Sequence, residues 1–496
     1  MNEVQLDVHD TKKLDELANV SSSLVERLSA SGDTTGTPYY HYRWKKKWLA
    51  DYVAWPIQTE DVSALLKFAS ANGIAVVARG GGTCYYGSAS PTRGGLVVDT
   101  KQMNKILEIN NEQKWLRVQA GAVFEEVDVE LYKHGLALPV VPQSAVAATI
   151  GGWLGTGGKA GIGTPKYGSL SDNILEAEVV RPDGSIETVD EEDIEEFMGT
   201  AGITGIVTEI KMRVRSLPEK IGGVMFAFYN LDAAIRAADK LAKTRNKPVY
   251  LRMTDLEYEW RIQGGLPPHS RGSVFVLAVY DSSEAVLNDA LDTGRKILEE
   301  AGGRDLGPAY FEKGWEERFK VEMKLKLEVP TLSMQNFWIP LTRIGPVVRK
   351  MYKLANNYSV CSCFYLVYGS GNMVRLCVFA PSDHRHWMHF MAGKTMLHHL
   401  VKEAYQEGGE LYTFGLQNSV YLKRYQPELY ERFKELRNKW DPNGIMNPDK
   451  LTHTNISYTR MNLMFTMNGR LRRIQIRLLG KEFLCVVPVS GQGGIL

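Results

Sequence analysis

Three consecutive glycines mark the stretch of the chain best suited to bind a phosphate group. A short apolar run leads into Arg79, Gly80, Gly81, Gly82 and Thr83. Glycines permit a positive φ and a close approach of the backbone, so several N–H groups can converge on one anion. Turn-forming residues and then an apolar strand follow, where a doubly wound dinucleotide fold would have a helix. The stretch is therefore either a nucleotide-diphosphate loop between two strands or a plain glycine-rich turn.

A second glycine-rich region, residues 142–168, favours the ligand-binding interpretation. It contains eight glycines. Ordering so many glycines costs backbone entropy, and a close approach to a large ligand explains that cost better than a mere connector does. Gly158 and Lys159 resemble the end of a P-loop. Trp153 and Ala160 stand where that motif requires Gly and Ser or Thr, which excludes it.

The composition excludes several other classes of protein. A formal net charge of +2 gives no indication of a nucleic-acid partner. The five cysteines form no C-x-x-C pair, which argues against a disulfide framework, structural zinc or an iron–sulfur cluster. Histidines gather at 384–399, but no carboxylate or cysteine completes a recognised spacing, so we expect no metal. The start lacks a signal-peptide pattern and no apolar run approaches the ~20 residues of a membrane helix, which favours a cytoplasmic protein.

The spacing of apolar residues predicts a mixed α+β protein. A helix that ends at Gly73 and a strand at 74–78 precede the first glycine-rich loop. Another helix is predicted at 11–31, although its run of three serines could break it. Residues 220–380 alternate strands with helices and predict a separate domain.

The end of the chain does not continue this pattern. From residue 452 onwards it carries six arginine or lysine residues and one glutamate. Short apolar runs predict strands at 462–467 and 483–489. This basic segment could contact a partner subunit or the surface of an anionic membrane, or it could be a disordered terminus.

Five motifs in this order resemble those of the vanillyl-alcohol oxidase / p-cresol methylhydroxylase (PCMH) family of FAD enzymes, and most closely its D-lactate and glycolate oxidase-like branch. Beside the two glycine-rich regions they are Pro182-Asp183-Gly184, Gly205-Ile206-Val207-Thr208 and Asp441-Pro442-Asn443-Gly444-Ile445-Met446-Asn447-Pro448. The resemblance spans roughly residues 45–452. It implies an α+β fold with a PCMH-type FAD-binding domain of two subdomains at 1–217 (core 45–217). A cap domain that binds the substrate would follow at 218–452, with a C-terminal return to the FAD site, and 453–496 would be a basic extension.

The resemblance also implies which residues bind FAD. The FAD-binding positions carried over from the family are Arg79, Gly80, Gly81, Gly82, Thr83, Cys84, Gly87, Pro142, Ser144, Thr149, Gly151, Gly152, Gly158, Gly161, Tyr167, Gly168, Asp172, Ile206, Val207 and Asn447. Some members attach FAD covalently through a histidine after the glycines. Thr83 and Cys84 occupy that region here, so we expect FAD to be bound non-covalently. A thioether to Cys84 and a simple buried thiol are both open alternatives.

Two departures from the family concern the substrate site. The 2-hydroxy-acid branch has a histidine-rich metal-binding motif in the cap, where this chain has Gly369, Ser370, Gly371 and Asn372. The same branch has Glu-His-Gly with a histidine base where this chain has Glu-Leu-Tyr, ending at Tyr412. This chain thus lacks the metal-binding histidines and the histidine base that usually support metal-assisted oxidation of D-lactate or glycolate.

Three polar side chains are candidates for the chemistry beside the flavin, which accepts a hydride at N5. Tyr412 could act as a base if nearby cations lower the pKa of its phenol, or it could be a packed aromatic residue with a hydrogen-bonded hydroxyl. Arg252 and Arg375 could bind a carboxylate through the fork of a guanidinium, although arginines are also common on protein surfaces.

These features predict an FAD-dependent oxidoreductase that acts on the CH–OH group of a small hydroxy acid or alcohol. We expect a dehydrogenase rather than an oxidase, with the electrons passing to a quinone or to a redox partner of the iron–sulfur or electron-transfer flavoprotein type. The alternative is a flavoprotein subunit that transfers electrons within, or scaffolds, a larger complex without oxidising a substrate. The basic extension could add a peripheral membrane contact.

Overall fold

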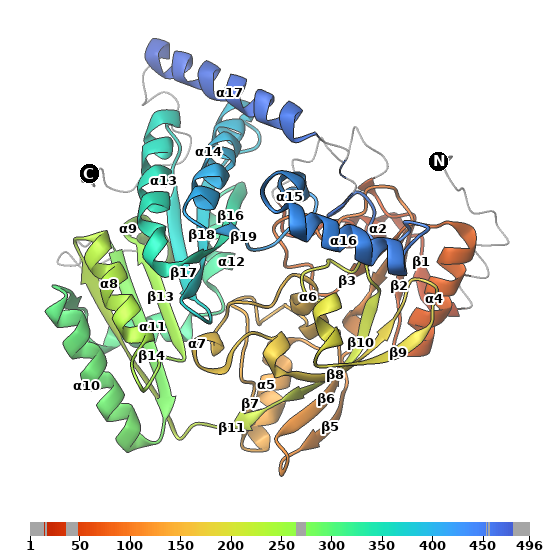
Figure 1. The fold of residues 1–496 in the computed structure, drawn as a ribbon, viewed down its shortest axis with the longest axis horizontal. Coiled ribbons are helices and arrows are strands. Elements are labelled where there is room, and N and C mark those ends of the chain that lie inside the picture. The colour runs from red at the N-terminus through yellow and green to blue at the C-terminus, as the bar shows by residue number, and fades with distance from the viewer. Residues whose placement is uncertain are drawn as a thin grey trace. The chain divides into compact units, whose positions relative to one another are not determined.

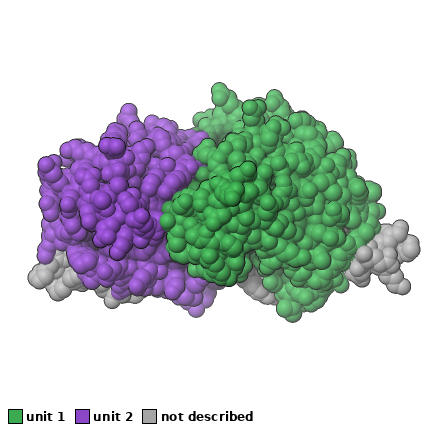
Figure 2. All heavy atoms as spheres, turned by 90° about the horizontal axis from the view of Figure 1, so that it is seen from below, with its two compact units in different colours: residues 1–158, 170–217, 413–458 green, residues 159–169, 218–412, 459–496 purple. Residues whose placement is uncertain are grey.

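The computed structural model describes residues 14, 17–35, 48–263, 274–452, 454 and 457–479. The chain divides into two compact units, coloured separately in Figure 2. The first unit comprises residues 1–158, 170–217 and 413–458. The second comprises residues 159–169, 218–412 and 459–496. Both combine helices with sheets, which confirms the predicted α+β class (Figure 1).

The first glycine-rich loop lies at the end of a strand in a four-stranded sheet of the first unit. The strands follow the order β1 (Asn19–Ser21), β2 (Tyr52–Trp55), β4 (Leu96–Asp99) and β3 (Val76–Arg79). Helix α4 (Thr59–Asn72) connects β2 to β3 and ends at Gly73, which has a φ of +62°. Its buried residues Val62, Leu65 and Ala69 share one apolar core with the strands. The apolar spacing that predicts this helix is therefore the spacing that packs it.

A second, antiparallel sheet carries the other motifs of the first unit. Its strands follow the order β5 (Ile106–Asn110), β6 (Trp115–Gln119), β10 (Ile206–Arg213), β8 (Ile174–Val180) and β9 (Ile186–Asp190). Two short strands, β7 (Leu136–Ala137) and β11 (Arg215–Ser216), pair separately. The helices of this part are α5 (Phe124–Lys133) and α6 (Ile150–Gly155), with short turns η2 (Thr100–Gln102), η3 (Ser171–Asn173) and η4 (Asp193–Glu196).

The C-terminal segment 413–458 belongs to the first unit and supplies helices α15 (Ser419–Tyr425) and α16 (Pro427–Trp440). Its next residues extend along β3, since the N–H of Val76 donates to the carbonyl of Ile445 at 2.8 Å. The N–H of Asn447 in turn donates to the carbonyl of Val76 at 2.7 Å. Residues separated by more than three hundred positions in the sequence thus lie side by side at the first glycine-rich loop.

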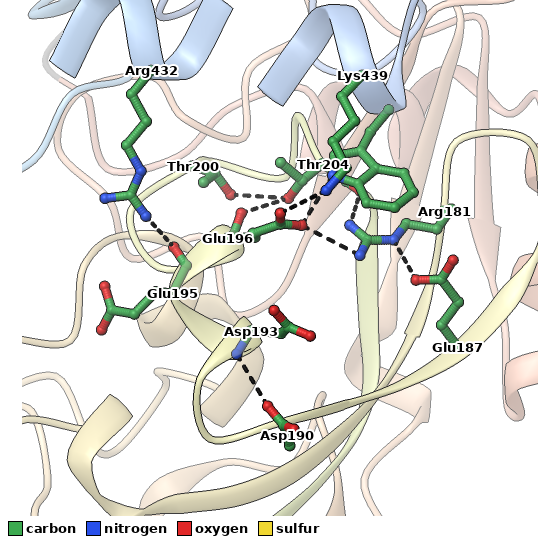
Figure 3. A network of polar contacts seen from close by, with 11 residues as sticks. Arg181, Glu187, Asp190, Asp193, Glu195, Glu196, Thr200, Thr204, Arg432 and Lys439 are labelled. Atoms are coloured by element: carbon green, nitrogen blue, oxygen red, sulfur yellow. Dashed lines mark hydrogen bonds and ion pairs between the residues drawn. The ribbon is translucent and has the colours of Figure 1, made fainter. Parts of the chain in front are cut away.

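A buried arginine fixes α16 to the segment that follows β9 (Figure 3). Arg181 is 3% exposed and donates to Glu187 at 2.8 Å and to Glu196 at 3.4 Å. Its guanidinium lies 3.5 Å from the ring centroid of Trp440, whose indole N–H donates to Glu196 at 2.9 Å. Lys439 completes the network with an ion pair to Glu196 at 3.0 Å. Glu196 is thus a partner of α16, while Asp190, Glu191, Glu192, Asp193 and Glu195 beside it are exposed.

The second unit is built on one eight-stranded sheet. Its order is β15 (Arg304–Asp305), β12 (Lys220–Phe228), β14 (Val274–Ser282), β13 (Tyr250–Asp255), β17 (Cys363–Tyr368), β18 (Met373–Ser382), β16 (Thr331–Pro340) and β19 (Glu410–Leu411). Its helices are α7 (Thr164–Tyr167), α8 (Leu231–Ala242), α9 (Leu256–Gln263), α10 (Glu284–Glu300), α11 (Pro308–Glu316), α12 (Val321–Glu328), η5 (Leu341–Arg343), α13 (Ile344–Tyr358), α14 (Trp387–Gln406) and α17 (Tyr458–Leu479). Gly222 faces leucines of α10, and Ala380 faces Gly393 of α14, so these two helices cover the same face of the sheet.

Three sequence-based predictions of local structure need correction or lie outside the described residues. Within the predicted helix at 11–31, Leu14 and Leu17 are helical, and residues 11–13, 15 and 16 lie outside the described residues. The rest of the range is not one helix, because strand β1 and then the short helix α2 (Leu24–Ala30) follow. The predicted strand at 462–467 is part of α17. The predicted strand at 483–489 lies outside the described residues. Among the described helices, none is long and apolar enough to cross a membrane.

We expect Arg181→Ala to lower the free energy of unfolding of the first unit by about 2 kcal/mol, because the partly exposed carboxylates of Glu187 and Glu196 lose their hydrogen bonds to a buried guanidinium. The matched control is Arg213→Ala, which removes an exposed ion pair to Glu191 of 2.7 Å. That pair should contribute less than about 1 kcal/mol. Urea titrations of both variants measure the difference, and equal losses would contradict the role given to Arg181.

Candidate functional site

The two glycine-rich regions meet in the first unit, and each needs its glycines. A Cβ added at Gly80 would overlap the hydroxyl of Thr149, and one added at Gly81 would overlap the carbonyl oxygen of Ala147. Gly82 has a φ of +65°, a conformation that favours glycine. The backbones therefore approach each other with no room for side chains. Such a surface can present N–H groups directly to a bound anion.

The second region contributes a short helix and further close contacts. Thr149 caps α6 by accepting a hydrogen bond from the N–H of Gly152 at 3.2 Å. A Cβ at Gly151 would lie 2.8 Å from the Cβ of Ala120. At Gly158, with a φ of +52°, it would lie 2.9 Å from Leu170. These glycines are thus required by packing as well as by any ligand.

Gln143 is a buried amide that the sequence did not single out. It is 5% exposed, and neither its oxygen nor its nitrogen has a hydrogen-bond partner among the described residues. An amide buried in this way costs free energy unless a ligand pairs with it. It stands between Pro142 and Ser144, both predicted to contact FAD, and that position was the only signal in the sequence. The glycine cradle and this amide together fit a large polar cofactor such as FAD.

The C-terminal segment brings a second buried polar group, Lys450, to the loop. The amide of Asn447 donates to the carbonyls of Ser88 at 2.9 Å and Ala201 at 2.6 Å. Lys450 donates to Asn447 Oδ1 and to the carbonyl of Ser90. Burial lowers the pKa of Lys450 to about 7, while the charge of Asp33 opposes this shift. Sequence reasoning identified Asn447 but missed Lys450, which lies only three residues later.

The stretch that contains Asp33 lies against the first glycine-rich loop. The N–H of Thr34 donates to the carbonyl of Cys84 at 3.0 Å, and its hydroxyl donates to the carbonyl of Thr83 at 2.8 Å. Arg79 donates to the carbonyl of Gly32 and pairs with Asp99 at 3.6 Å. Burial raises the pKa of Cys84 to about 11, and its sulfur lies 3.2 Å from the hydroxyl of Ser88. The thiol therefore stays protonated at neutral pH.

The remaining predicted FAD residues are distributed over both units. Gly87 has a φ of +78° and packs against Leu416 of the C-terminal segment. Ile206 and Val207 begin β10, and Asp172 lies in η3. Gly161, Tyr167 and Gly168 belong to the segment 159–169 of the second unit. The first unit thus contains the first glycine-rich loop, residues 142–158 of the second region and Asn447, whereas Gly161, Tyr167 and Gly168 belong to the second unit.

The three predicted catalytic side chains lie on one face of the sheet in the second unit. Arg252, Val367, Arg375 and Trp338 are directly opposite one another across β13, β17, β18 and β16. Opposed residues of antiparallel strands share a face. Tyr412 follows β19, and its N–H donates to the carbonyl of Asn336 at 3.1 Å.

Tyr412 lies among hydrogen-bond donors and aromatic rings. Its phenol oxygen accepts from the N–H groups of Lys159 at 3.1 Å and Ala160 at 2.9 Å. The ring centroids of Trp338 and Tyr412 lie 6.0 Å apart. Burial raises the pKa of Tyr412, and Arg375 together with the two N–H donors offsets this only in part. The condition under which Tyr412 could act as a base, a pKa lowered by nearby cations, is therefore not met. Tyr412 is a protonated phenol that can donate a hydrogen bond.

The two arginines have different surroundings. Arg252 donates to the fully buried carboxylate of Glu259 at 2.9 Å, and Thr254 donates to the same oxygen at 2.6 Å. Arg375 donates to the hydroxyl of Tyr365 at 3.0 Å. Its guanidinium lies 5.5 Å from the ring centroids of both Tyr365 and Tyr412. Arg252 is thus committed to Glu259, a residue that sequence reasoning missed, and Arg375 lies beside Tyr412.

The histidines of α14 take part in packing. His398 donates from Nε2 to the amide oxygen of Asn462 at 3.0 Å, and His399 shares a hydrogen bond of 2.9 Å with the hydroxyl of Tyr358. Burial lowers the pKa of His389 to about 4. Among the described residues, no three histidine, cysteine, aspartate or glutamate side chains are arranged to hold a metal ion.

Comparisons with known proteins identify two family models along the chain. The model described as "FAD binding domain" matches residues 50–190. The model described as "FAD linked oxidases, C-terminal domain" matches residues 217–451.

Two curated relatives illustrate the similarity over most of the chain. The glycolate oxidase subunit GlcD of Bacillus subtilis is 27% identical over 456 residues, covering 87% of this chain and 94% of that protein. The D-lactate dehydrogenase of Archaeoglobus fulgidus is 26% identical over 412 residues, covering 80% and 90%.

Solved structures share the fold at lower identity. An alkyldihydroxyacetonephosphate synthase superposes with a TM-score of 0.76 and 18% identity, covering 91% of this chain and 87% of that one. A p-cresol methylhydroxylase with substrate bound superposes with a TM-score of 0.76 and 15% identity, covering 91% and 99%.

We expect Gly81→Ala to weaken FAD binding at least roughly tenfold, because the added Cβ would push the two loops apart. Gly155→Ala is the matched control in the same unit, since an added Cβ there meets nothing within 4 Å. Titration of the FAD-free proteins with FAD, followed by flavin fluorescence, measures both affinities. Equal affinities would show that the contact between the loops does not shape the site.

Gln143→Leu separates cofactor binding from stability. We expect the FAD-free variant to be at least as stable as the wild type, because it no longer buries an unpaired amide. Its affinity for FAD should fall about tenfold through the lost hydrogen bond. Thermal unfolding with and without FAD measures both quantities. A destabilised FAD-free variant with unchanged affinity would assign Gln143 to packing.

Proposed function

This chain is a member of the vanillyl-alcohol oxidase / p-cresol methylhydroxylase family of FAD-linked oxidoreductases, and on that premise we propose that it is a dehydrogenase for a small organic hydroxy acid or alcohol. The observation that carries the proposal is the pairing of Arg375 with Tyr412 on one face of the sheet in the second unit. A guanidinium and a phenol O–H suit a ligand that has both a carboxylate and a hydroxyl oxygen.

The first unit would hold FAD through its two glycine-rich loops. Gly80, Gly81 and Gly82 would face the diphosphate, and the amide of Gln143 would pair with a polar edge of the cofactor. The chemistry that FAD would supply when bound is to accept a hydride from a C–H bond of the substrate.

The second unit would bind and orient the substrate. Arg375 balances the charge of an acid, and its position against two aromatic rings limits its hydration without removing its charge. Tyr412 keeps its proton because burial raises its pKa. It therefore orients a substrate oxygen as a donor, while the N–H groups of Lys159 and Ala160 fix its own oxygen.

The names of two relatives support this substrate class, and the word dehydrogenase in one of them supports an electron acceptor other than oxygen. One is named a D-lactate dehydrogenase and the other a subunit of glycolate oxidase. Both names refer to 2-hydroxy acids, and the second refers to one component of a larger enzyme. The acceptor we propose is a quinone or a redox partner protein of the iron–sulfur or electron-transfer flavoprotein type.

Anaerobic photometry of the FAD-loaded protein tests the function directly. Glycolate, both enantiomers of lactate, longer 2-hydroxy acids and neutral alcohols are added separately, and the flavin absorbance is followed. Bleaching by any of them supports the proposal. Bleaching only by a reduced redox protein would instead indicate an electron-transfer or scaffolding subunit. Rapid reoxidation by air, compared with a quinone analogue, would indicate an oxidase.

With a substrate that bleaches the flavin, Tyr412→Phe should slow flavin reduction about tenfold to a hundredfold, because one hydrogen bond to the reacting group is lost. Tyr229→Phe on an exposed tyrosine is the matched control. Arg375→Lys should raise the dissociation constant of acids about tenfold but hardly change that of neutral alcohols. Stopped-flow absorbance separates the two effects, and uniform losses for acids and alcohols would refute a carboxylate site at Arg375.

We also propose that FAD is bound without a covalent link. Thr83 carries no imidazole, and burial raises the pKa of the Cys84 thiol to about 11, so the thiolate that could attack the flavin is scarce. Acid precipitation should release all of the flavin into the supernatant, from the wild type and from Cys84→Ser alike. Yellow colour in the protein pellet of the wild type alone would demonstrate a thioether.

A further inference from the structure

Helix α17 presents its polar side to the second unit and its apolar side to solvent. The amide of Asn468 donates to the carbonyl of Met391 at 3.1 Å and to the hydroxyl of Thr395 at 2.7 Å, both on α14. Arg472 is 3% exposed and donates to the carbonyl of Tyr358 at 3.0 Å, at the C-terminal end of α13. A helix packed only for stability would bury its apolar stripe instead.

Further contacts fix the same side of the helix against α13 and α14 (Figure 1). Asn462 forms a hydrogen bond of 3.0 Å with His398, and Phe465 stacks on that imidazole with ring centroids 4.7 Å apart. Gly469 is buried, and a Cβ there would lie 3.0 Å from the hydroxyl of Tyr358. The helix is therefore held in one rotation about its axis, which decides which residues face outward.

The outward side carries a continuous apolar stripe. Its members recur at intervals of three or four residues and each is at least half exposed: Leu463 at 59%, Met467 at 54%, Leu471 at 58%, Ile474 at 51% and Leu478 at 77%. This spacing follows one face of an α-helix over about 22 Å. Met464, 47% exposed, widens the stripe. An apolar surface of this kind is rarely left uncovered in a protein.

The charge of α17 indicates what covers the stripe. Its 22 residues include five arginines and no aspartate or glutamate. Arg460, Arg470, Arg473 and Arg477 are exposed, and Arg470 and Arg477 lie on the same flank of the stripe, seven residues apart. Two copies of the helix packed on each other would bring like charges together, whereas an anionic lipid surface offers both apolar chains and negative charge.

We propose that α17 is a membrane-surface helix, which inserts its stripe between the head groups of anionic phospholipids while its flanking arginines contact the phosphates. The helix lies parallel to the membrane, consistent with its docking along the second unit. This inference does not depend on the substrate, and binding to vesicles needs none.

Sedimentation of the FAD-loaded full chain with large vesicles tests the proposal. Vesicles of phosphatidylcholine with phosphatidylglycerol should bind the protein at least tenfold more tightly than phosphatidylcholine alone. The difference should shrink at high salt, which screens the arginines. Equal partitioning into both vesicles, or none into either, would overturn the proposal.

Variants assign the binding to the stripe and its flank. The triple variant Met467→Gln/Leu471→Gln/Ile474→Gln should lose at least tenfold in binding, while Leu327→Gln, on an exposed leucine of α12 in the same unit, should lose none. Arg470→Gln/Arg477→Gln should lose about fivefold for each arginine on anionic vesicles. Circular dichroism confirms that the helix remains, because the substituted side chains face outward.

Sedimentation velocity in the absence of lipid tests whether a second copy of the chain, rather than a membrane, covers the stripe. A wild type that dimerises, with a triple variant that is monomeric, would show that a second copy covers the stripe and would overturn the membrane proposal. A wild type whose oligomeric state is unchanged by the triple variant supports it.

Discussion

The contact between two backbone segments, Gly80–Gly82 and Ala147–Gly152, is the constraint on which the first unit depends. Neither Gly80 nor Gly81 can carry a Cβ without overlapping the opposite loop. The loops therefore offer N–H groups instead of side chains, and they gain this at the cost of the conformational entropy of many glycines. Parallel pairing of β3 with β4 and the cap of Thr149 on α6 hold both sides of the contact in place.

The C-terminal segment extends the same constraint. Asn447 adopts a φ of +40°, which is costly for a residue with a side chain, and its amide compensates by satisfying two carbonyls of other loops. Lys450 is fully buried beside it, and the carboxylate of Asp33 is the charge that most opposes the lowering of its pKa. A buried cation of this kind is stable only while its acceptors are in place. The first glycine-rich loop is thus ordered by residues that the chain supplies only near its end.

The sequence predicted those features that are decided locally. Glycine runs identified both loops, and apolar spacing identified α4, β3 and the alternation of strands and helices over 220–380, because the residues of each element determine which of its faces is packed. The segment Asn462–Met467 misled because a short apolar run fits a strand as well as a helix, and only contacts with α13 and α14 decide between them. Gln143, Lys450 and Glu259 were missed because their importance arises from burial. The missing partner of Gln143 and the ion pair of Glu259 are properties of the folded chain.

Arg252 and Arg375 show that residue type alone does not tell which arginine can recognise a substrate. They lie in one row of the same sheet, and the sequence gives no reason to prefer either. A substrate carboxylate at Arg252 would have to displace Glu259, which would then be a buried anion without its cation, at a cost of several kcal/mol. Arg375 lies against the faces of Tyr365 and Tyr412, which stabilise a guanidinium without neutralising it. An acid bound at Arg375 does not break the ion pair between Arg252 and Glu259, so the position of that glutamate argues against Arg252 as the arginine that recognises a substrate.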